Sequence, residues 1–409
     1  MTYTTSSEYP HVLLLRCDPI PHVRIGFIGL GRRGKQSFNN YMYLEGVEIR
    51  AVCDLKEENL AEARKLMAEK KKRPAEEYTA PDGWKKICER NDIDLVYVCT
   101  SMKMHAEIAV YAMENNKHVA IEVPIVNTIE ECWQIVNTAE KFRRHCIMLE
   151  NCCYERFEMA ALNMCSQGLL GEVFHAEGSY IHDLRNIDFQ QRPDYTEQWQ
   201  KSGNPYPTHG LGPICQAMNI HRGDRLAWLV SVSNAQFTHP NTGIENYEEK
   251  CILGNTNTTI IKTERQKTIV LQHDISSPRP YCRNYMLSGT KGFIQKAEMP
   301  LVHIPEGNAD AQKNGKEIIE QYDHPFYREK GEQAIRIGAH DGMDYMMDYR
   351  LIHCLQKGLP LDMDVYDAVE WSSLVELTRL SIERGCVPVD IPDFTRGAWK
   401  ELPNLTFAE

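Results

Sequence analysis

The feature that most constrains this 409-residue chain is a glycine pattern near its start. Residues 23–34 read VRIGFIGLGRRG, so an apolar run ends in G-x-G-x-x-G at Gly29, Gly31 and Gly34. The pattern follows a predicted strand and opens a predicted helix, a context that favours a dinucleotide site over a plain glycine turn. Glycines there permit a tight turn and close approach of a pyrophosphate, which the N–H groups of the helix start can bind. We therefore expect a Rossmann domain.

The rest of the chain divides into two parts by its hydrophobic rhythm. Apolar, strand-like runs alternate with amphipathic helical stretches as far as residue 150, which predicts a doubly wound parallel sheet in an α/β protein. Beyond residue 150, strand-like runs broken by Gly and Asn predict an open, mainly antiparallel sheet, and two helical stretches close the chain. We expect an NAD-binding Rossmann domain at residues 1–150 and a substrate-binding α+β domain at residues 151–409.

A carboxylate at the end of the second predicted strand indicates which dinucleotide is bound. Asp54 would accept hydrogen bonds from ribose hydroxyls and repel a 2′-phosphate, which favours NAD over NADP. Arg32 and Arg33 weaken this preference, because a nearby arginine could hold a phosphate. Loops that follow other strands of the same sheet are expected to line the same crevice, namely residues 100–105, 122–124 and 150–151.

Composition and missing motifs exclude several classes of protein. The formal net charge of -11 disfavours nucleic acid or an anionic membrane as a partner. The N-terminus has no basic start and only a short apolar stretch at residues 12–15, so we expect a cytoplasmic protein. The 14 cysteines include no C-x-x-C pair, which favours reduced, buried thiols. No H-E-x-x-H or G-x-S-x-G motif supports metal or serine-hydrolase chemistry.

Clustered tyrosines and histidines mark the second predicted domain. Tyr180 and His182 would point to the same face of a strand. Tyr206 and His209 lie in a Pro- and Gly-rich loop, and one helical turn would align them. Tyr281 lies in a third such segment, PRPY. These residue types transfer protons and bind sugar hydroxyls, although spacing alone favours a structural role for each.

Several segments of this sequence resemble those of known protein families. The first 150 residues resemble the Gfo/Idh/MocA oxidoreductases. The segments EGSYIHDL, YPTHGLGP, IHRGDR, GMDYMMDYRL and IPDFTRGAW look like glycoside hydrolase family 109, whose described members are NAD-dependent α-N-acetylgalactosaminidases. The resemblance covers residues 23–399. Dehydrogenases of the wider group usually carry Glu-Lys-Pro where this chain has Glu122-Val123-Pro124, and the missing lysine argues against a plain sugar dehydrogenase.

The resemblance also implies particular site residues. Contacts to NAD are implied at Arg32, Arg33, Asp54, Met102, Lys103, His105, Glu122, Val123, Asn151 and Tyr206, besides the three glycines of the loop. Contacts to the sugar are implied at Tyr180, Arg192, Tyr206, Thr208, His209 and Tyr281. No metal ligand is expected.

The function predicted from these residues is a retaining-type glycosidase that uses tightly bound NAD. Sugar C3 is oxidised transiently, the C2 proton leaves, the aglycone is eliminated from C1, water adds and C3 is reduced again. Tyr206 and His209 are the first candidates for the proton transfers, and Tyr180 and His182 the second. The alternatives are an NAD-dependent sugar or cyclitol dehydrogenase and a non-catalytic NAD-binding sensor. The expected partner is a small-molecule glycoside, with a homo-oligomer possible, and the exact sugar and anomer stay open.

Overall fold

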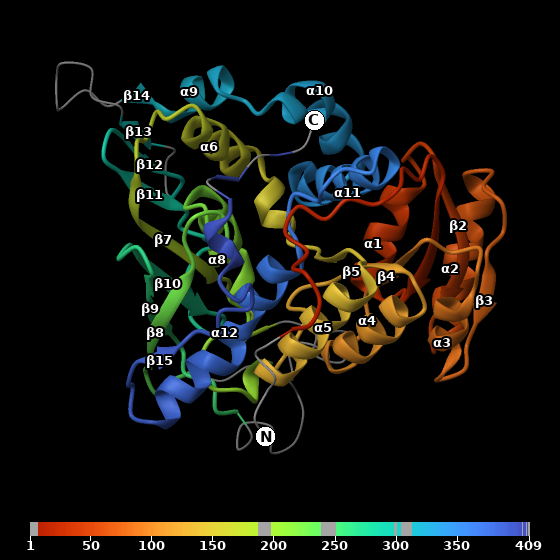
Figure 1. Cartoon of the computed structure of the whole chain (residues 1–409), viewed down its shortest axis with the longest axis horizontal. Helices are drawn as coiled ribbons and strands as arrows, with labels where there is room; N and C mark the ends of the chain where they lie inside the picture. The colour runs from red at the N-terminus through yellow and green to blue at the C-terminus, as the bar shows by residue number, and fades with distance from the viewer. Residues whose placement is uncertain are drawn as a thin grey trace. The chain divides into compact units, whose positions relative to one another are not determined.

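The computed structural model describes residues 7–186, 198–238, 251–297, 301–303 and 313–402, with Asn404, Leu405 and Phe407. The chain forms two compact units (Figure 1). The first comprises Met1–Glu155, Phe326–Val369 and Thr406–Glu409, and the second comprises Arg156–Pro325 and Glu370–Leu405. The sequence predicts a single domain boundary after residue 150, whereas in the structure the segment Phe326–Val369 also belongs to the first unit.

The first unit is built on a six-stranded parallel sheet with the order β3-β2-β1-β4-β5-β6. This order confirms the predicted doubly wound Rossmann fold. The strands are β1 (Val23–Ile28), β2 (Val47–Cys53), β3 (Glu76–Tyr78), β4 (Leu95–Val98), β5 (His118–Ile121) and β6 (Cys146–Met148). The helices between them are α1 (Arg32–Tyr41), α2 (Glu57–Glu69), α3 (Gly83–Glu89), α4 (His105–Glu114) and α5 (Ile129–Phe142), with short 3-10 turns η1 (Met102–Met104) and η2 (Asn151–Tyr154).

Local sequence explains why these elements form. Strands β4 and β5 are wholly buried, as expected for parallel strands covered on both faces. Helix α5 begins with a capping box, in which the backbone N–H of Glu131 donates to Thr128 and the Glu131 carboxylate accepts from the backbone N–H of Thr128. In the core, the Phe27 ring stacks on Tyr97 with centroids 4.7 Å apart.

Helix α11 (Met343–Lys357) completes the first unit, although it lies far along the chain. It packs against α1 (Figure 1) and also against β1. Its Asp348 carboxylate accepts hydrogen bonds from Asn40 Nδ2 at 2.9 Å and from Tyr97 Oη at 3.0 Å. These long-range contacts explain why the segment Phe326–Val369 belongs to the first unit.

The second unit is built on a nine-stranded sheet with the order β14-β13-β12-β11-β7-β10-β9-β8-β15. Only the β7–β10 pair is parallel among the described pairs, so the sheet is mixed and mainly antiparallel, as predicted. The strands are β7 (Val173–Ile181), β8 (Leu226–Ser233), β9 (Asn257–Thr263), β10 (Thr268–Asp274), β11 (Met286–Gly289), β12 (Phe293–Gln295), β13 (Leu301–His303), β14 (Lys313–Asn314) and β15 (Val389–Asp390). The remaining longer helices are α6 (Arg156–Ser166), α8 (Thr208–Ala217), α9 (Gly315–Gln321), α10 (Pro325–Ile337) and α12 (Val365–Glu383), of which α10 and α12 each have residues in both units.

Helix α8 lies directly on strands β7 and β10 because glycines remove the side chains between them. A Cβ on Gly178 would lie 2.2 Å from the carbonyl oxygen of Gly210, and one on Gly210 would lie 2.7 Å from Leu271 Cδ1. The sequence interpretation of residues 204–210 as a loop is therefore wrong from Thr208 onward. The glycine that suggested a loop instead lets the helix approach the sheet.

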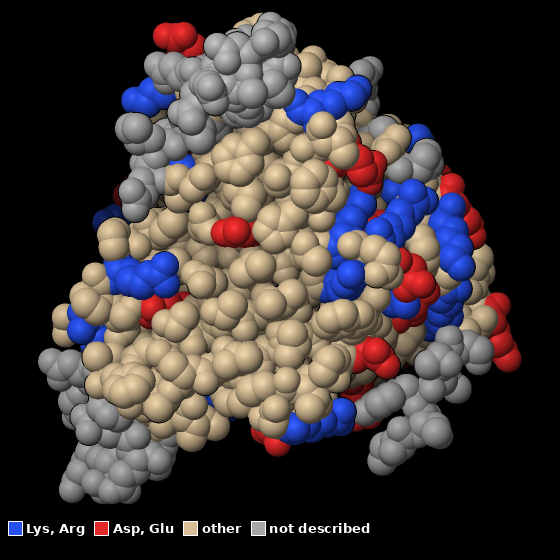
Figure 2. All heavy atoms as spheres, turned by 90° about the vertical axis from the view of Figure 1, so that its left-hand side faces the viewer, with Lys and Arg blue, Asp and Glu red and all other residues tan. Residues whose placement is uncertain are grey.

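The opposite face of this second sheet carries few charges. Val230, Ile260 and Val270 are paired across β8, β9 and β10 and point away from the buried positions of those strands. Ile260 and Val232 are among the exposed apolar side chains. Figure 2 looks from the side of this sheet and shows a broad area with few Lys, Arg, Asp or Glu residues. All 14 cysteines are free, and no described helix has the length and apolar composition needed to cross a membrane.

Candidate active site

The glycine loop leaves room for an anion at the start of α1. Gly29 has φ +89°, and a Cβ there would lie 2.5 Å from the carbonyl oxygen of Cys99. Gly31 caps α1, and a Cβ there would meet no heavy atom within 4 Å. The first turn of α1 holds no acidic side chain to compete for its free N–H groups. The open surface over Gly31 therefore fits the pyrophosphate of a dinucleotide.

Asp54 is held at the carboxyl end of β2, beside this loop. Its Oδ2 accepts a hydrogen bond from the backbone N–H of Leu30 at 2.7 Å. Its Oδ1 accepts from the backbone N–H of Lys56 at 2.8 Å and from Asn59 Nδ2 at 3.0 Å. The carboxylate is thus fixed beside the glycine loop, at the place where the sequence predicts a contact to the ribose.

The two arginines of the loop differ in their surroundings. Arg32 is exposed and makes no hydrogen bond or ion pair within the described part of the chain. Arg33 donates from Nε to Glu122 Oε1 at 2.7 Å and from Nη1 to Asp344 Oδ2 at 2.8 Å. Burial disfavours its charge, but the two carboxylates outweigh burial and raise the pKa of Arg33 well above its ordinary value. In the sheet order β2 and β5 lie on opposite sides of β1, so the Arg33 side chain, which binds Glu122 after β5, reaches away from Asp54 after β2.

Asp344, which no sequence pattern singled out, binds two of the predicted cofactor residues. Its side chain is 0% exposed. Its Oδ1 accepts from Asn151 Nδ2 at 2.6 Å, and its Oδ2 accepts from Arg33 and, at 2.8 Å, from His340 Nδ1. Burial opposes ionisation, but Arg33 and His340 outweigh it and lower the pKa of Asp344. The motif GMDYMMDYRL contains this residue, yet nothing local in the motif indicates a partner so far away in the sequence.

The other predicted cofactor residues lie on the loops that follow β4, β5 and β6. Met102 and Lys103 form η1, and Val123 follows Glu122 at the end of β5. His105 is buried, with Nδ1 3.1 Å from the carbonyl oxygen of Pro124 and Nε2 3.1 Å from that of Thr100. Burial lowers the pKa of His105 to about 4, so the ring is neutral and donates its single N–H to one of these two carbonyl oxygens at a time.

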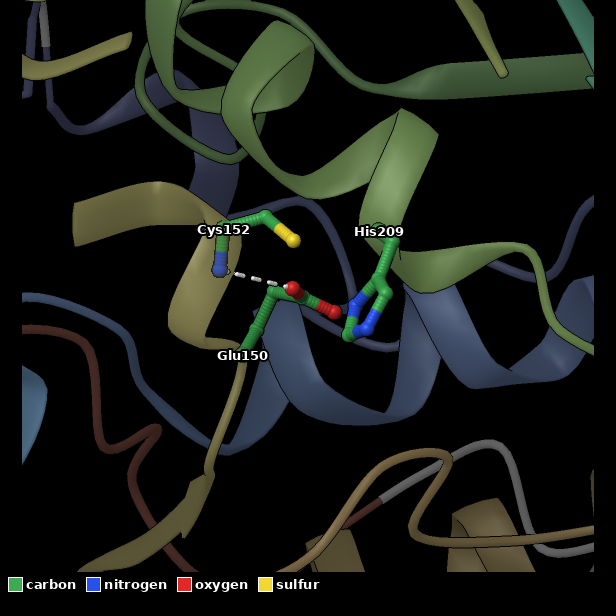
Figure 3. Close-up of side chains that lie close together, drawn as sticks. All are labelled: Glu150, Cys152 and His209. Carbon is green, nitrogen blue, oxygen red and sulfur yellow. Dashed lines mark hydrogen bonds between the residues drawn. The ribbon is translucent and has the colours of Figure 1, made fainter. Parts of the chain in front are cut away.

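The turn that carries Asn151 is fixed from within. Glu150 Oε1 accepts a hydrogen bond from the backbone N–H of Cys152 at 3.1 Å (Figure 3). Both side chains are buried, and Asn151 between them is also buried. Figure 3 also shows His209, which projects from α8 of the second unit.

In the second unit, the structure brings the predicted tyrosines and histidines together. The ring centroid of Tyr180 lies 4.9 Å from that of Tyr206 and 5.5 Å from that of His209. The rings of Tyr206 and His209 are 4.8 Å apart. Tyr180 Oη lies 3.3 Å from His182 Nδ1, and Tyr281 lies 5.1 Å from the ring of His182. Three separate chain segments therefore form one aromatic cluster.

The members of this aromatic cluster differ in exposure. Tyr180 is 6% exposed and packs in a core with Leu184 and Trp199. Tyr206 and His209 are half-buried, so a ligand can reach them, and Tyr281 is 52% exposed. Arg192, the remaining predicted sugar contact, lies outside the described residues.

Buried polar atoms next to the aromatic cluster lack protein partners. Both ring nitrogens of His273 and Oγ1 of Thr208 are buried without a hydrogen-bond partner among the described residues. His273 is the β10 partner of Tyr180, and their rings are 6.1 Å apart at 28°. Burial lowers the pKa of His273 to about 4, so the ring is neutral. No motif surrounds His273 in the sequence, whereas Thr208 was a predicted sugar contact.

Comparison with known proteins identifies the family. Residues 154–401 match the family described as "Glycosyl hydrolase 109, C-terminal domain", and residues 23–149 match "Oxidoreductase family, NAD-binding Rossmann fold". A protein of Bacteroides fragilis named "Alpha-N-acetylgalactosaminidase" is 50% identical over 96% of both chains. The chain belongs to glycosyl hydrolase family 109. The predicted family resemblance and the prediction of a glycosidase are thus confirmed.

Further matches agree with this membership. "Glycosyl hydrolase family 109 protein 2" of Phocaeicola vulgatus is 48% identical and covers 96% of this chain and 99% of its own. A solved scyllo-inositol dehydrogenase of Lactobacillus casei, with bound NAD(H) and scyllo-inositol, aligns with TM-score 0.65 over 90% of this chain and 99% of its own. At 14% identity this structure shows a common fold alone. The family 109 chain thus shares its overall fold with this inositol dehydrogenase.

Proposed function

We propose that this family 109 chain is an α-N-acetylgalactosaminidase that works with tightly bound NAD. The observation that supports this most directly is the 50% identity, over 96% of both chains, to the protein named for that activity. The aromatic cluster of the second unit adds chemical support. Its half-buried Tyr206 and His209 are proton-transfer groups of the kind the reaction needs.

The first unit offers groups suited to the pyrophosphate and to a ribose of NAD. The start of α1 over Gly31 suits the pyrophosphate, and Asp54 suits the ribose hydroxyls. Glu122 and Asn151, at the ends of β5 and β6, are proposed contacts to the other half of the cofactor. Bound NAD would supply a hydride acceptor for sugar C3 and later return the hydride, so the overall reaction consumes no oxidant.

The protein's own residues would carry the protons. With C3 as a ketone, the C2–H bond is acidic, and a base on the protein removes that proton. The electron pair forms the C1–C2 double bond as the C1–O bond to the aglycone breaks, and a protonated group supplies the leaving oxygen with its proton. Water then adds across the C1–C2 double bond, with its oxygen at C1 and a proton at C2. Once the hydride is back on C3, the products are the free sugar and the free aglycone, and the net reaction is hydrolysis.

Tyr206 and His209 are the first candidates for these two proton transfers. Their rings are 4.8 Å apart, and both are accessible. A tyrosine with an ordinary pKa near 10 is a weak base at neutral pH, so an adjacent histidine helps by accepting or sharing the proton. The second candidates are Tyr180 and His182, whose Oη and Nδ1 atoms are 3.3 Å apart.

The test is hydrolysis of p-nitrophenyl α- and β-N-acetylgalactosaminides with NADH absorbance recorded in the same cuvette. We expect nitrophenol release from the α-anomer without accumulation of NADH. NADH formation on free sugars without nitrophenol release would instead support the sugar dehydrogenase. Tight NAD binding with no turnover of any glycoside would support the sensor.

We also propose a homo-oligomer, formed through the sparsely charged face of the second sheet. Val230, Val232 and Ile260 lie on that face, and a large exposed apolar area is typical of an interaction surface. Light scattering on a sizing column should give at least a dimer, and Ile260→Lys should shift it towards monomer. A wild-type monomer at micromolar concentration would contradict this proposal.

Cytoplasmic localisation stays a prediction, to be checked by cell fractionation.

A further inference from the structure

Two buried aspartates on α11 have different kinds of partner. Asp344 and Asp348 are one helical turn apart and so share a face of the helix. Both side chains are fully buried. Asp348 binds Asn40 and Tyr97, which belong to the core of the first unit. Asp344 instead binds Arg33 and Asn151, two of the proposed cofactor contacts.

Asp344 connects the two ends of the proposed cofactor site. Arg33 belongs to the glycine loop and the first turn of α1, and Asn151 opens η2 after β6. In the sheet order, β1 and β6 are separated by β4 and β5, so the two segments are held by one carboxylate across several strands. Removing that carboxylate would take away the acceptor of Arg33 Nη1 and of Asn151 Nδ2 in a buried place, which is costly, although Arg33 Nε would keep Glu122.

The charge arrangement points to function as well as stability. Arg33 keeps 26% of its side chain exposed, whereas Asp344 exposes none. The pair therefore presents its cation towards the surface and keeps its anion inside. Well-packed apolar side chains often stabilise a core as well as a buried ion pair does, so stability alone does not require this pair.

We propose that Asp344 is a positioning residue of the dinucleotide site. Its ionised carboxylate fixes Arg33 and Asn151 so that the glycine loop and the end of β6 are ready for NAD before it binds. Preorganisation of this kind raises affinity because less conformational freedom is lost on binding. The proposal rests on the proposed NAD site but not on the glycosidase chemistry.

The test is direct titration of NAD-free full-length protein with NAD, by calorimetry. We expect Asp344→Asn, which keeps the shape but removes the charge, to weaken NAD affinity at least about tenfold. The matched control is Asp348→Asn, the same change on the same helix at the same burial. We expect the control to keep NAD affinity within about twofold of the wild type.

A double-mutant cycle shows whether Asp344 acts through Arg33. In an Arg33→Gln background, Asp344→Asn should weaken NAD affinity clearly less than it does alone, because the main partner is already gone. Asp344→Glu keeps the charge but lengthens the side chain, so its NAD affinity should lie between those of Asp344→Asn and the wild type. If circular dichroism shows that Asp344→Asn does not fold, the proposal is tested with the folded Asp344→Glu variant instead. An NAD affinity of Asp344→Glu equal to that of the wild type would then overturn the proposal.

Two results with folded variants would also overturn it. One is unchanged NAD affinity in Asp344→Asn. The other is an equal loss of affinity in Asp344→Asn and Asp348→Asn, which would indicate a general effect on the fold. Wild-type protein that binds NAD but hydrolyses no glycoside would count against the proposed function. The NAD affinities of the Asp344 variants would still test the proposal made here.

Discussion

The candidate sites of the two units are built on different physical principles. In the first unit, Arg33, Glu122, Asn151 and Asp344 satisfy one another through short hydrogen bonds and ion pairs. In the second unit, ring contacts hold the aromatic cluster together, and polar atoms of Thr208 and His273 stay buried without protein partners among the described residues. Because buried polar groups are almost always hydrogen-bonded, these atoms mark where a ligand or ordered water belongs.

This difference indicates a division of labour. A cofactor that stays bound through each turnover suits a site whose groups are fixed in advance by charge. A sugar that enters and leaves suits a mainly aromatic site with a few polar groups to bind it. The comparison predicts that substitutions in the first unit mainly weaken cofactor binding, whereas substitutions in the second unit mainly lower the rate of catalysis or the affinity for the sugar.

The largest effect is expected from the proton-transfer candidates. Tyr206→Phe and His209→Ala should each lower kcat by about 10²- to 10⁴-fold, the usual range for loss of a general acid or base. Steady-state rates with an α-N-acetylgalactosaminide would measure this loss. Because Tyr206 is also an implied cofactor contact, NAD affinity must be titrated beside the rates, and His209→Ala should leave it unchanged. Full activity in both folded, NAD-loaded variants would contradict the proposed roles.

The next effect concerns stability in the first unit. Burial raises the pKa of Asp348 to about 7, although its hydrogen bond from Asn40 acts in the opposite direction. The folded protein therefore binds a proton more tightly than the unfolded chain, so stability should fall as pH rises from about 4 to about 7. The loss has an upper limit of about 4 kcal/mol. Chemical unfolding of Asp348→Asn should lack this part of the pH dependence, and identical pH profiles for both proteins would refute the assignment.

A smaller effect is expected at the ribose carboxylate. Asp54→Ala should weaken NAD binding by about 10- to 100-fold, the range for losing a hydrogen bond to a charged group, and should narrow the preference for NAD over NADP. Calorimetric titration with both dinucleotides measures the change. The affinity of the Asp54→Ala variant for free sugar should equal that of the wild type, because the predicted sugar contacts belong to the second unit. An unchanged ratio of the two affinities would show that Asp54 does not select the cofactor.

The smallest expected change in free energy is at His273. Replacing a buried histidine that has no partner by leucine removes unsatisfied polar atoms and should raise stability by about 1 kcal/mol. The same His273→Leu variant should bind the sugar less well, seen as a higher KM with kcat little changed. Lower stability together with unchanged KM would mean that His273 has an ordinary structural role.

The sequence allowed much of the first unit to be predicted, because its signals are local. The G-x-G-x-x-G pattern and the alternating strands and helices up to residue 150 predicted the observed parallel sheet. The role of α11 was not predictable in this way. Its pairing of Asp344 with Arg33 joins residues far apart in the chain, and no local pattern encodes such a partner.

In the second unit, local signals were less informative. Gly and Pro near residues 204–210 suggested a loop, but the structure uses Gly210 to bring α8 against the sheet. Tyr180, Tyr206 and Tyr281 were predicted as site residues, and the structure brings them together. His273 was missed because its place beside Tyr180 depends on strand pairing, and a lone histidine in an apolar strand carries no motif.

The most direct test of the central claim is hydrolysis of an α-N-acetylgalactosaminide in heavy water, with the released sugar analysed by proton NMR. The proposed elimination removes the C2 proton and later returns one from groups that exchange with solvent. The account therefore predicts deuterium at C2 of the released sugar. Complete retention of protium at C2, with normal turnover, would contradict it and indicate direct displacement at C1.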